Sequence, residues 1–316
     1  MLRLVAACLI LLLSSAAAGG AELYYLDRDP FTDQYTGPVG PLVLSGEIVP
    51  GDYALFLARI AEDPDRFLQQ DKLILASNEG DAAEAIKIAK LVKSLDTQVS
   101  VGPLTGRCAG ACFLIYAAAA QRGTDGESLL GLRRPGLAES EWVGRPTTEA
   151  ALLEDAMQAP VREFLVENDV PAELIEQMFK LAPTDAYWLT ESDEAALGAK
   201  SSVFQQFLAK SCGWNPSLDR ALYRGEFDEA KKLAACSAGA TQTEARKALV
   251  QALKDASVPV PASLAAAEAA DSAAPAGHAA ASPAHAKPHP AHAKPAPTRA
   301  KVNPKPPAES KTTPSS

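Results

Sequence analysis

Short apolar runs alternate with amphipathic segments through the first half of the chain. Residues 42–48, 72–76 and 98–102 are rich in Val, Leu or Ile, and their length and nearly continuous apolar character predict buried strands. Residues 53–60 and 82–94 instead repeat their apolar positions at helical spacing. The order of strand, helix, strand and helix predicts a parallel sheet with right-handed crossovers, covered by helices, which is an α/β fold.

The stretch Arg107–Arg122, with the sequence RCAGACFLIYAAAAQR, joins a small-residue turn to a long apolar run. Ala109–Ala120 has no polar face at any helical phase, which predicts a buried helix. A strand that turns sharply into such a helix is a common position for the nucleophile of a hydrolase, because N–H groups at a helix start stabilise negative charge. Here the tip of the turn is Gly110, so the scaffold is predicted without its nucleophile.

The pattern beyond this stretch predicts more helices and two short strands. The strands are expected at 128–131 and 187–190, with a loop over 136–148. The expected helices are Glu149–Asn168, Ala172–Leu181 and Glu191–Leu197, the last ended by Gly198, followed by two or more helices within 215–256.

Residues 1–21 are typical of a secretory signal peptide. Arg3 provides the charged start, Leu4–Leu13 the apolar core, and a run of small residues leads to Gly20-Ala21. The apolar core is too short to span a bilayer comfortably. Cys8 lies before most of the apolar core, which is too early for a lipid acylation site. We therefore expect an exported, periplasmic protein with no integral membrane segment after signal cleavage.

The remaining chain divides into three predicted parts, an α/β domain over 22–211, a small helical region over 212–257 and a tail over 258–316. The tail holds twelve of the 24 prolines and no aromatic residue, so it is expected to be disordered. The net charge of −9 conceals a basic tail and a body of about −13, which argues against nucleic acid as a partner. The tail could contact an anionic envelope polymer or serve only as a flexible end.

Four cysteines follow the signal, namely Cys108, Cys112, Cys212 and Cys236. An even number in an oxidising compartment predicts two disulfides, with two buried thiols as the alternative for the first pair. Of the three connectivities, the local pairing is Cys108–Cys112 with Cys212–Cys236. Two positions four apart on a helix lie about 6 Å apart, so a Cys108–Cys112 bridge is expected to distort the helix start.

These elements resemble the Clp/crotonase superfamily, and specifically exported bacterial proteins similar to the proteolytic subunit of Clp protease. The resemblance covers Leu42–Lys200. It rests on Leu44-Ser45-Gly46-Glu47-Ile48, on the turn and helix Ser77–Ala89, on Cys108–Tyr116 and on Tyr187-Trp188-Leu189-Thr190.

The resemblance implies a Ser-His-Asp triad, of which this chain lacks the first two members. Gly110, followed by Ala111, stands in Cys108-Ala109-Gly110-Ala111-Cys112, where the relatives have Cys-x-Ser-Ala-Cys. Arg133 stands in Gly131-Leu132-Arg133-Arg134-Pro135, where the relatives have Gly-x-His-x-Pro. Asp185 is a candidate for the acid.

The turn that forms the oxyanion hole in the relatives reads Glu79-Gly80 here instead of paired glycines. Gly80 can still offer a backbone N–H, whereas Glu79 brings a carboxylate to a place that stabilises negative charge. Arg133-Arg134 could hold Glu79 in an ion pair if the cleft has closed.

All four histidines, His278, His285, His289 and His292, lie in the tail. The body therefore has no imidazole for a Ser-His or Cys-His pair, nor for a histidine zinc site. We accordingly expect no cofactor and no metal site.

The sequence favours a catalytically inactive binding or scaffold module for a peptide or an envelope protein, and the resemblance to ring-forming relatives allows a homo-oligomer through 149–181. The alternative is a serine-type hydrolase whose nucleophile has moved to Ser77 or Thr105, acting with a lysine. An acyl-thioester enzyme of the crotonase type is disfavoured by export and by Glu79.

Overall fold

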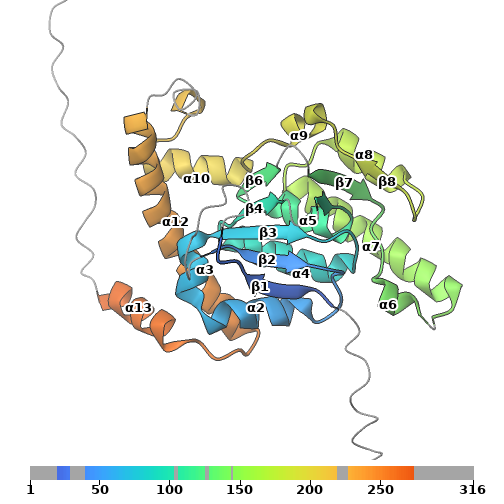
Figure 1. Ribbon diagram of the computed structural model, residues 1–316, viewed down its shortest axis with the longest axis horizontal. Coiled ribbons are helices and arrows are strands. Elements are labelled where there is room, and N and C mark those ends of the chain that lie inside the picture. Colours follow the sequence, from blue (N-terminus) through green and yellow to red (C-terminus); the bar gives the residue numbers. More distant parts are fainter. Residues whose placement is uncertain are drawn as a thin grey trace, which may run out of the picture. The chain divides into compact units, whose positions relative to one another are not determined.

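A computed structural model of the protein describes residues 20–28, 40–102, 106–124, 128–143, 145–218 and 227–273. Its centre is a five-stranded sheet with the strand order β1-β2-β3-β4-β6 (Figure 1). The strands are β1 Glu22–Tyr25, β2 Leu42–Ser45, β3 Lys72–Ala76, β4 Gln98–Val101 and β6 Gln121–Thr124. β2, β3, β4 and β6 run parallel and β1 is antiparallel to β2, which confirms the predicted α/β class.

One face of this sheet carries the main core. Alternate residues of the strands, such as Leu44, Leu75 and Val101, are fully buried in one hydrophobic cluster with residues of the covering helices. These helices include α2 Asp52–Glu62, α3 Pro64–Gln70, α4 Ala82–Ser94 and α5 Ala111–Ala118. The intervening residues Val43 and Ile74, which are register partners, form a smaller cluster on the opposite face. Period-two alternation within continuous apolar runs explains why both faces are buried.

A second, three-stranded sheet lies in the order β5-β7-β8, with β5 Arg107–Cys108, β7 Leu129–Arg133 and β8 Ala186–Trp188. β5 is parallel to β7, and β7 is antiparallel to β8, where Gly131 pairs with Trp188. A Cβ on residue 131 would lie 2.6 Å from the Trp188 ring, so a glycine is needed for this close approach. This sheet delivers both the first cysteine and Arg133.

The remaining helices are α6 Glu139–Trp142, α7 Thr147–Glu167, α8 Ala172–Lys180, α9 Glu191–Leu197, α10 Ser202–Cys212, α12 Phe227–Asp255 and α13 Ala262–Ala273. α9 begins with a capping box between Thr190 and Asp193 and ends at Gly198, as expected. Within the region predicted for homo-oligomer contacts, α7 exposes Leu152 and Val166; that assembly stays a prediction.

The buried guanidinium of Arg122 connects three helix ends. It donates to the carbonyl O of Ala117 at 2.6 Å in α5, of Leu197 at 2.8 Å in α9, and of Asn168 at 3.0 Å just after α7. Burial lowers the pKa of Arg122 from its ordinary value. These carbonyl groups lie at helix C-termini, where a cation is favoured, and the arrangement fixes the end of α5 behind the predicted site.

Several elements differ from the sequence expectation. β1 forms in the expected irregular lead-in, because its residues pair in register with β2. The expected helix Ala109–Ala120 is shorter at both ends, and β6 begins at Gln121 directly after it. The expected loop over 136–148 contains α6 and the first turn of α7, and α3 and α10 were not predicted. In each case the local pattern is weak, and tertiary contacts decide whether the segment forms a helix, a strand or a loop.

The helical region after residue 212 packs against the α/β domain. Ala245, Leu249 and Leu253 of α12 are buried in the main core, and α12 contacts α2, α3 and α4. Residues up to 273 accordingly form one compact unit. α13 lies within the segment expected to be disordered, and its Leu264 is fully buried. Residues 1–19 of the expected signal and 274–316 of the tail lie outside the described residues.

Both local cysteine pairs are disulfides, with Cα–Cα distances of 5.3 Å for Cys108–Cys112 and 5.8 Å for Cys212–Cys236. The expected distortion of the helix does not arise, because α5 begins only at Ala111 and Cys108 belongs to strand β5. The first bridge therefore ties the strand end to the first turn of α5. The second links α10 to α12.

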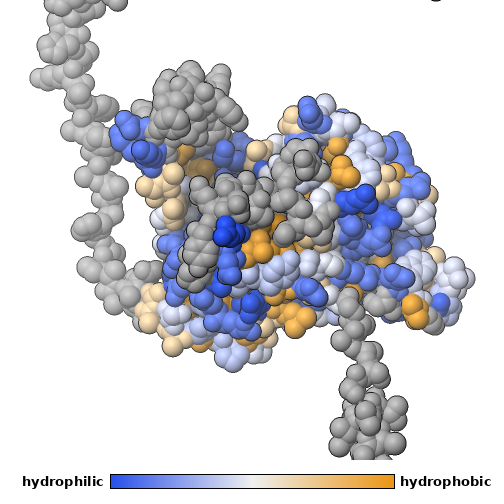
Figure 2. Space-filling model, viewed as in Figure 1, coloured by the Kyte–Doolittle hydropathy of each residue, from blue (hydrophilic) through white to orange (hydrophobic). Residues whose placement is uncertain are grey.

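On the face drawn in Figure 2, hydrophilic residues predominate and hydrophobic residues appear as separate patches. Throughout the described ranges, no helix combines the length and the apolar character needed to cross a bilayer.

Candidate functional site

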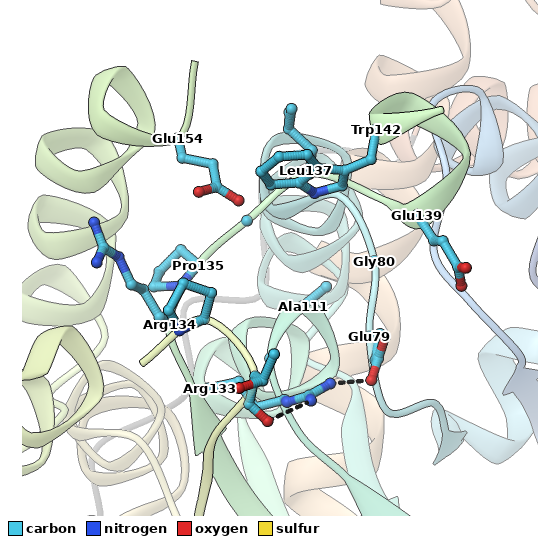
Figure 3. A pocket seen from close by; sticks show the side chains of 14 residues that line it. Glu79, Gly80, Ala111, Arg133, Arg134, Pro135, Leu137, Glu139, Trp142 and Glu154 are labelled. Atoms are coloured by element: carbon cyan, nitrogen blue, oxygen red, sulfur yellow. Dashed lines mark hydrogen bonds and ion pairs between the residues drawn. The ribbon is translucent and has the colours of Figure 1, made fainter. Parts of the chain in front are cut away.

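The five residues that the sequence singled out line one cavity. Glu79, Gly80, Gly110, Ala111 and Arg133 all contribute to a cavity of about 460 Å³ (Figure 3). Its other walls are formed by Arg134, Pro135, Gly136, Leu137, Glu139, Trp142, Glu154, Pro183 and Thr184. The turn after β3, the start of α5 and the segment after β7 therefore meet at this cavity.

Gly80 leaves its backbone N–H free on the side away from Ile48. The carbonyl O of Glu79 accepts from the Ile48 N–H at 3.3 Å, and the Asp81 N–H donates to the Ile48 carbonyl O at 2.7 Å. In a trans peptide the N–H points opposite to the carbonyl, so the Gly80 N–H points away from Ile48. A Cβ on residue 80 would lie 2.3 Å from the Ile48 carbonyl O at a φ of 137°, which only glycine tolerates.

Gly110 forms the sharp turn between β5 and α5. Its φ of 59° and ψ of −122° lie in a region that residues with side chains rarely adopt. A Cβ on this residue would nevertheless meet only ordinary contacts, 3.6 Å from the Arg133 Cβ and 3.6 Å from the Asn78 carbonyl O. The turn thus has space for a side chain at residue 110, where the glycine carries none.

Ala111 is the first residue of α5, and its N–H belongs to the first helical turn, where no carbonyl inside the helix can accept it. Within the described ranges, neither the Ala111 N–H nor the Gly80 N–H donates to a protein acceptor. Both residues line the cavity, and the N-terminal end of α5 faces it (Figure 3). The site therefore offers two backbone N–H donors to a ligand in this cavity.

Arg133 forms the ion pair with Glu79 that the sequence suggested. The guanidinium also donates through Nη2 to the Thr184 carbonyl O at 3.1 Å (Figure 3). The Arg133 side chain is 23% exposed and the Glu79 side chain 52%. The two charges of the pair neutralise each other beside Gly80. The pair does not close the cavity, which remains open next to it.

Glu139 and Glu154 add two carboxylates to the cavity wall, and Leu137 and Trp142 lie between them (Figure 3). Burial raises the pKa of the Glu154 carboxyl, although the Arg134 guanidinium opposes this rise. Arg134 itself extends away from Ala111 (Figure 3). Its guanidinium pairs with the Asp155 carboxylate at 3.5 Å. The cavity thus combines backbone donors at one end with carboxylates at its rim.

Sequence reasoning missed the part of the wall formed by Leu137, Trp142 and Glu154. The first two lie in or next to α6, in the segment expected to be a loop, and Glu154 lies on α7. A tryptophan between prolines and acidic residues in an expected loop was the one available signal, but the sequence did not show which cavity it would border.

The other named candidates lie elsewhere. Ser77 is buried, and its hydroxyl donates to the Glu79 carbonyl O at 3.2 Å, so it braces the turn and does not line the cavity. Asp185 is exposed and outside the cavity wall. Thr105 lies outside the described residues. Among the described residues, no group of three or more His, Cys, Asp or Glu side chains could hold a metal ion.

No family model matches the sequence, and no curated protein matches it. Several solved structures are similar to the chain. ClpP1 from Listeria monocytogenes has 18% identity over 50% of this chain and 86% of that chain, with a TM-score of 0.34. A mutant 1510-N membrane-bound stomatin-specific protease in complex with a substrate peptide has 16% identity over 54% and 78%, with a TM-score of 0.35. An enoyl-CoA hydratase from Shewanella pealeana has 11% identity over 81% and 88%, with a TM-score of 0.33.

Proposed function

We propose that this protein is a catalytically inactive, exported Clp-protease-like protein that binds a peptide segment of a partner in the bacterial envelope. The observation that carries the proposal is the open cavity at the start of α5, which presents the N–H groups of Gly80 and Ala111 but no nucleophile. Such a site can hold a carbonyl group without attacking it.

The loss of catalysis follows from the chemistry of the two replaced positions. Gly110 has no side chain that could attack a carbonyl carbon. Arg133 cannot accept a proton at neutral pH, because the guanidinium stays protonated. The body holds no histidine that could act as the base instead, and the Ser77 hydroxyl is buried and bonded within its own turn. A serine hydrolase needs both functions together.

The binding role follows from what remains. Two N–H donors that line one cavity suit the carbonyl O of a peptide bond. The charge of Arg133 is compensated by Glu79, so a neutral group is favoured over a free carboxylate. Glu139 and Glu154 at the rim favour a lysine or arginine side chain next to the bound carbonyl. Leu137 and Trp142 supply apolar contact. We therefore propose a peptide segment with a basic residue as the ligand.

Export is supported by the signal-like residues 1–21 and by the two disulfides, which form and persist in oxidising compartments. The basic, Pro-rich character of the tail suits contact with an anionic envelope polymer. A full chain and a chain that lacks residues 274–316 are expected to differ in sedimentation with cell-wall material, while peptide binding stays equal.

The binding proposal can be tested by removing one backbone donor. The full chain is panned against a displayed library of random heptapeptides, and the selected peptides are titrated by calorimetry. We expect enrichment of Lys or Arg. Ala111→Pro deletes the N–H at the first helical position, where proline is tolerated, and should weaken binding about fivefold, since a hydrogen bond is worth on the order of 1 kcal/mol.

The matched control is Ala172→Pro, which makes the same change at the exposed first residue of α8. It should bind as the wild-type protein does. A library that yields no peptide, or an Ala111→Pro variant that binds with unchanged affinity, would refute the proposed site.

A further inference from the structure

The side chain of Asp52 places a carboxylate inside the protein without a cation beside it. Asp52 is the first residue of α2 and is 1% exposed. Its Oδ2 accepts from the backbone N of Val49 at 2.8 Å and from the backbone N of Ala21 at 3.0 Å. Among the described residues, no lysine or arginine lies within ion-pair distance of it. Burial raises the pKa of this carboxyl, as expected for a charge removed from water.

A second buried carboxylate lies next to Asp52 and already has its cation. Glu84 is 2% exposed, accepts from the backbone N of Gly51 at 3.0 Å and of Tyr53 at 2.8 Å, and pairs with Lys87 at 2.7 Å. The negative charge of Glu84 also contributes to the raised pKa of Asp52. Among the described residues, the start of α2 therefore has two buried carboxylates but only one cation beside them.

The backbone nitrogen of Ala21 is held at Asp52 from two sides. Residue 22, directly after it, begins β1 and is the register partner of Ser45. The Ala21 side chain is only 9% exposed and belongs to the main core. On the other side, a Cβ on Gly20 would lie 2.9 Å from Oδ1 of Asp52, so the chain before Ala21 passes directly over the carboxylate.

We propose that the mature protein begins at Ala21, and that the new α-ammonium group of Ala21 is the counter-ion of Asp52. A signal-cleaving protease hydrolyses the Gly20–Ala21 peptide bond with one water molecule, leaving a carboxylate on Gly20 and an amine on Ala21. The amine takes up a proton at neutral pH, since α-amino groups have a pKa of about 8. Ala18 and Gly20 supply the small side chains that such a protease requires before the cleaved bond.

The structure favours cleavage of the Gly20–Ala21 bond over the Ala21–Glu22 bond, which a signal of residues 1–21 implies. Cleavage after Ala21 would remove the donor at 3.0 Å from Asp52 together with a buried core methyl group. Cleavage after Gly20 keeps the nitrogen in place and changes one N–H donor into three donors with a positive charge. Processing then stabilises the fold, because an uncompensated buried carboxylate becomes an ion pair only in the cleaved chain.

The first test is the identity of the mature N-terminus. The full chain is expressed with its signal in a bacterium that has a periplasm, and the exported protein is examined by intact mass and N-terminal sequencing. We expect Ala21 as the first residue. Glu22 or any other first residue would overturn the proposal. The inference shares only export with the proposed function, so a failure to bind peptides leaves it intact.

The second test measures the ion pair. A protein that starts at Ala21 is compared with one that keeps Ala18-Gly19-Gly20, each with wild-type Asp52, with Asp52→Asn and with the exposed control Glu22→Gln. We expect the extension to lower the Tm by roughly 5 °C in the wild type and in Glu22→Gln, and to have little effect in Asp52→Asn. An equal Tm for both wild-type forms would overturn the proposal.

A labelling experiment covers the case in which Asp52→Asn does not fold. The Ala21 amine of the shorter wild-type form should react with an acylating reagent at least tenfold more slowly than the N-terminal amine of the extended form, because it is buried and protonated. Equal reaction rates would contradict the buried ion pair.

Discussion

The Arg133 guanidinium pairs with the Glu79 carboxylate directly beside the free N–H of Gly80. Arg133 holds the position where the resemblance places a histidine, and Glu79 that of an oxyanion-hole glycine. Each replacement alone would change the charge of the cavity, and together they cancel. The pair therefore leaves the backbone donors as the main feature of the site.

Glu79→Gln should release the charge of Arg133 into the cavity. We expect peptides that end in a free carboxylate, or that carry an acidic residue, to bind about three- to tenfold more tightly, and peptides with a basic residue to bind more weakly. The free energy of unfolding should change by less than about 1 kcal/mol, because both partners are partly exposed. Calorimetric titration with matched acidic and basic peptides checks this. Glu62→Gln removes another exposed pair, with Arg59, and should leave both affinities unchanged.

Gly110→Ser should not restore hydrolysis by itself, because the body provides no imidazole. The substitution should cost about 1 kcal/mol of stability, since the φ of 59° is unfavourable for a residue with a side chain. Adding Arg133→His supplies an imidazole next to residue 110, because the Arg133 Cβ lies 3.6 Å from the site of a Cβ on residue 110. We expect hydrolysis of a nitrophenyl ester by the double variant only.

Turnover by the wild-type protein would contradict this expectation. If Ser77→Ala abolished that turnover, the hydrolase with a moved nucleophile would replace the binding proposal. Ser77→Ala is otherwise expected to affect stability alone, through the lost hydrogen bond to the Glu79 carbonyl O.

The two disulfides should differ in their effects. The chain between Cys212 and Cys236 is longer than that between Cys108 and Cys112. When both cysteines of a bridge become alanine, loop entropy therefore predicts that the free energy of unfolding falls by about 3.5 kcal/mol for Cys212–Cys236 and by about 2 kcal/mol for Cys108–Cys112. Peptide binding should fall only without Cys108–Cys112, because that bridge holds the start of α5. Denaturant unfolding and calorimetry measure the two effects. Equal losses of peptide binding in the two variants would show that Cys108–Cys112 does not position the site.

Asp71 and Asp96 should make stability fall as the pH rises from about 4 to 6. Burial, with a contribution from Asp96, raises the pKa of Asp71 to about 6. Burial, with a contribution from Glu244, raises the pKa of Asp96 to about 6. In this window the folded protein binds more protons than the unfolded chain, so the free energy of unfolding decreases with pH.

The variant Asp71→Asn/Asp96→Asn removes both charges at residues whose φ values are 42° and 51°, which asparagine tolerates. We expect a flatter pH profile and a gain of about 1 to 2 kcal/mol at pH 7, after allowance for solvent screening. Urea unfolding between pH 4 and 7 measures this, with the exposed Asp185→Asn as the control. Parallel profiles for the variant and the wild type would contradict the raised pKa values.

The sequence by itself determined the α/β class and the parallel central strands. Strand β3 and helix α4 have the predicted bounds, because a continuous apolar run and a capped amphipathic helix are specified by local spacing. The absence of histidine from the body is a property of composition and needs no fold. Gly110 was recognised as the tip of the turn before the apolar run, and Gly80 through the resemblance; the structure then places both at positive φ.

Only the tertiary structure decided which residues share a cavity and how charges are paired. Trp142 and Glu154 border the site because α6 and α7 fold across the segment after β7, and no local pattern contains that contact. The Ala21 nitrogen and Asp52 are 31 positions apart, and no local pattern linked them. The sequence suggested the Arg133–Glu79 pair across 54 positions, but not that the cavity stays open beside it. Periodicity records which face of an element is apolar, whereas the partner of a buried charge depends on how distant elements meet.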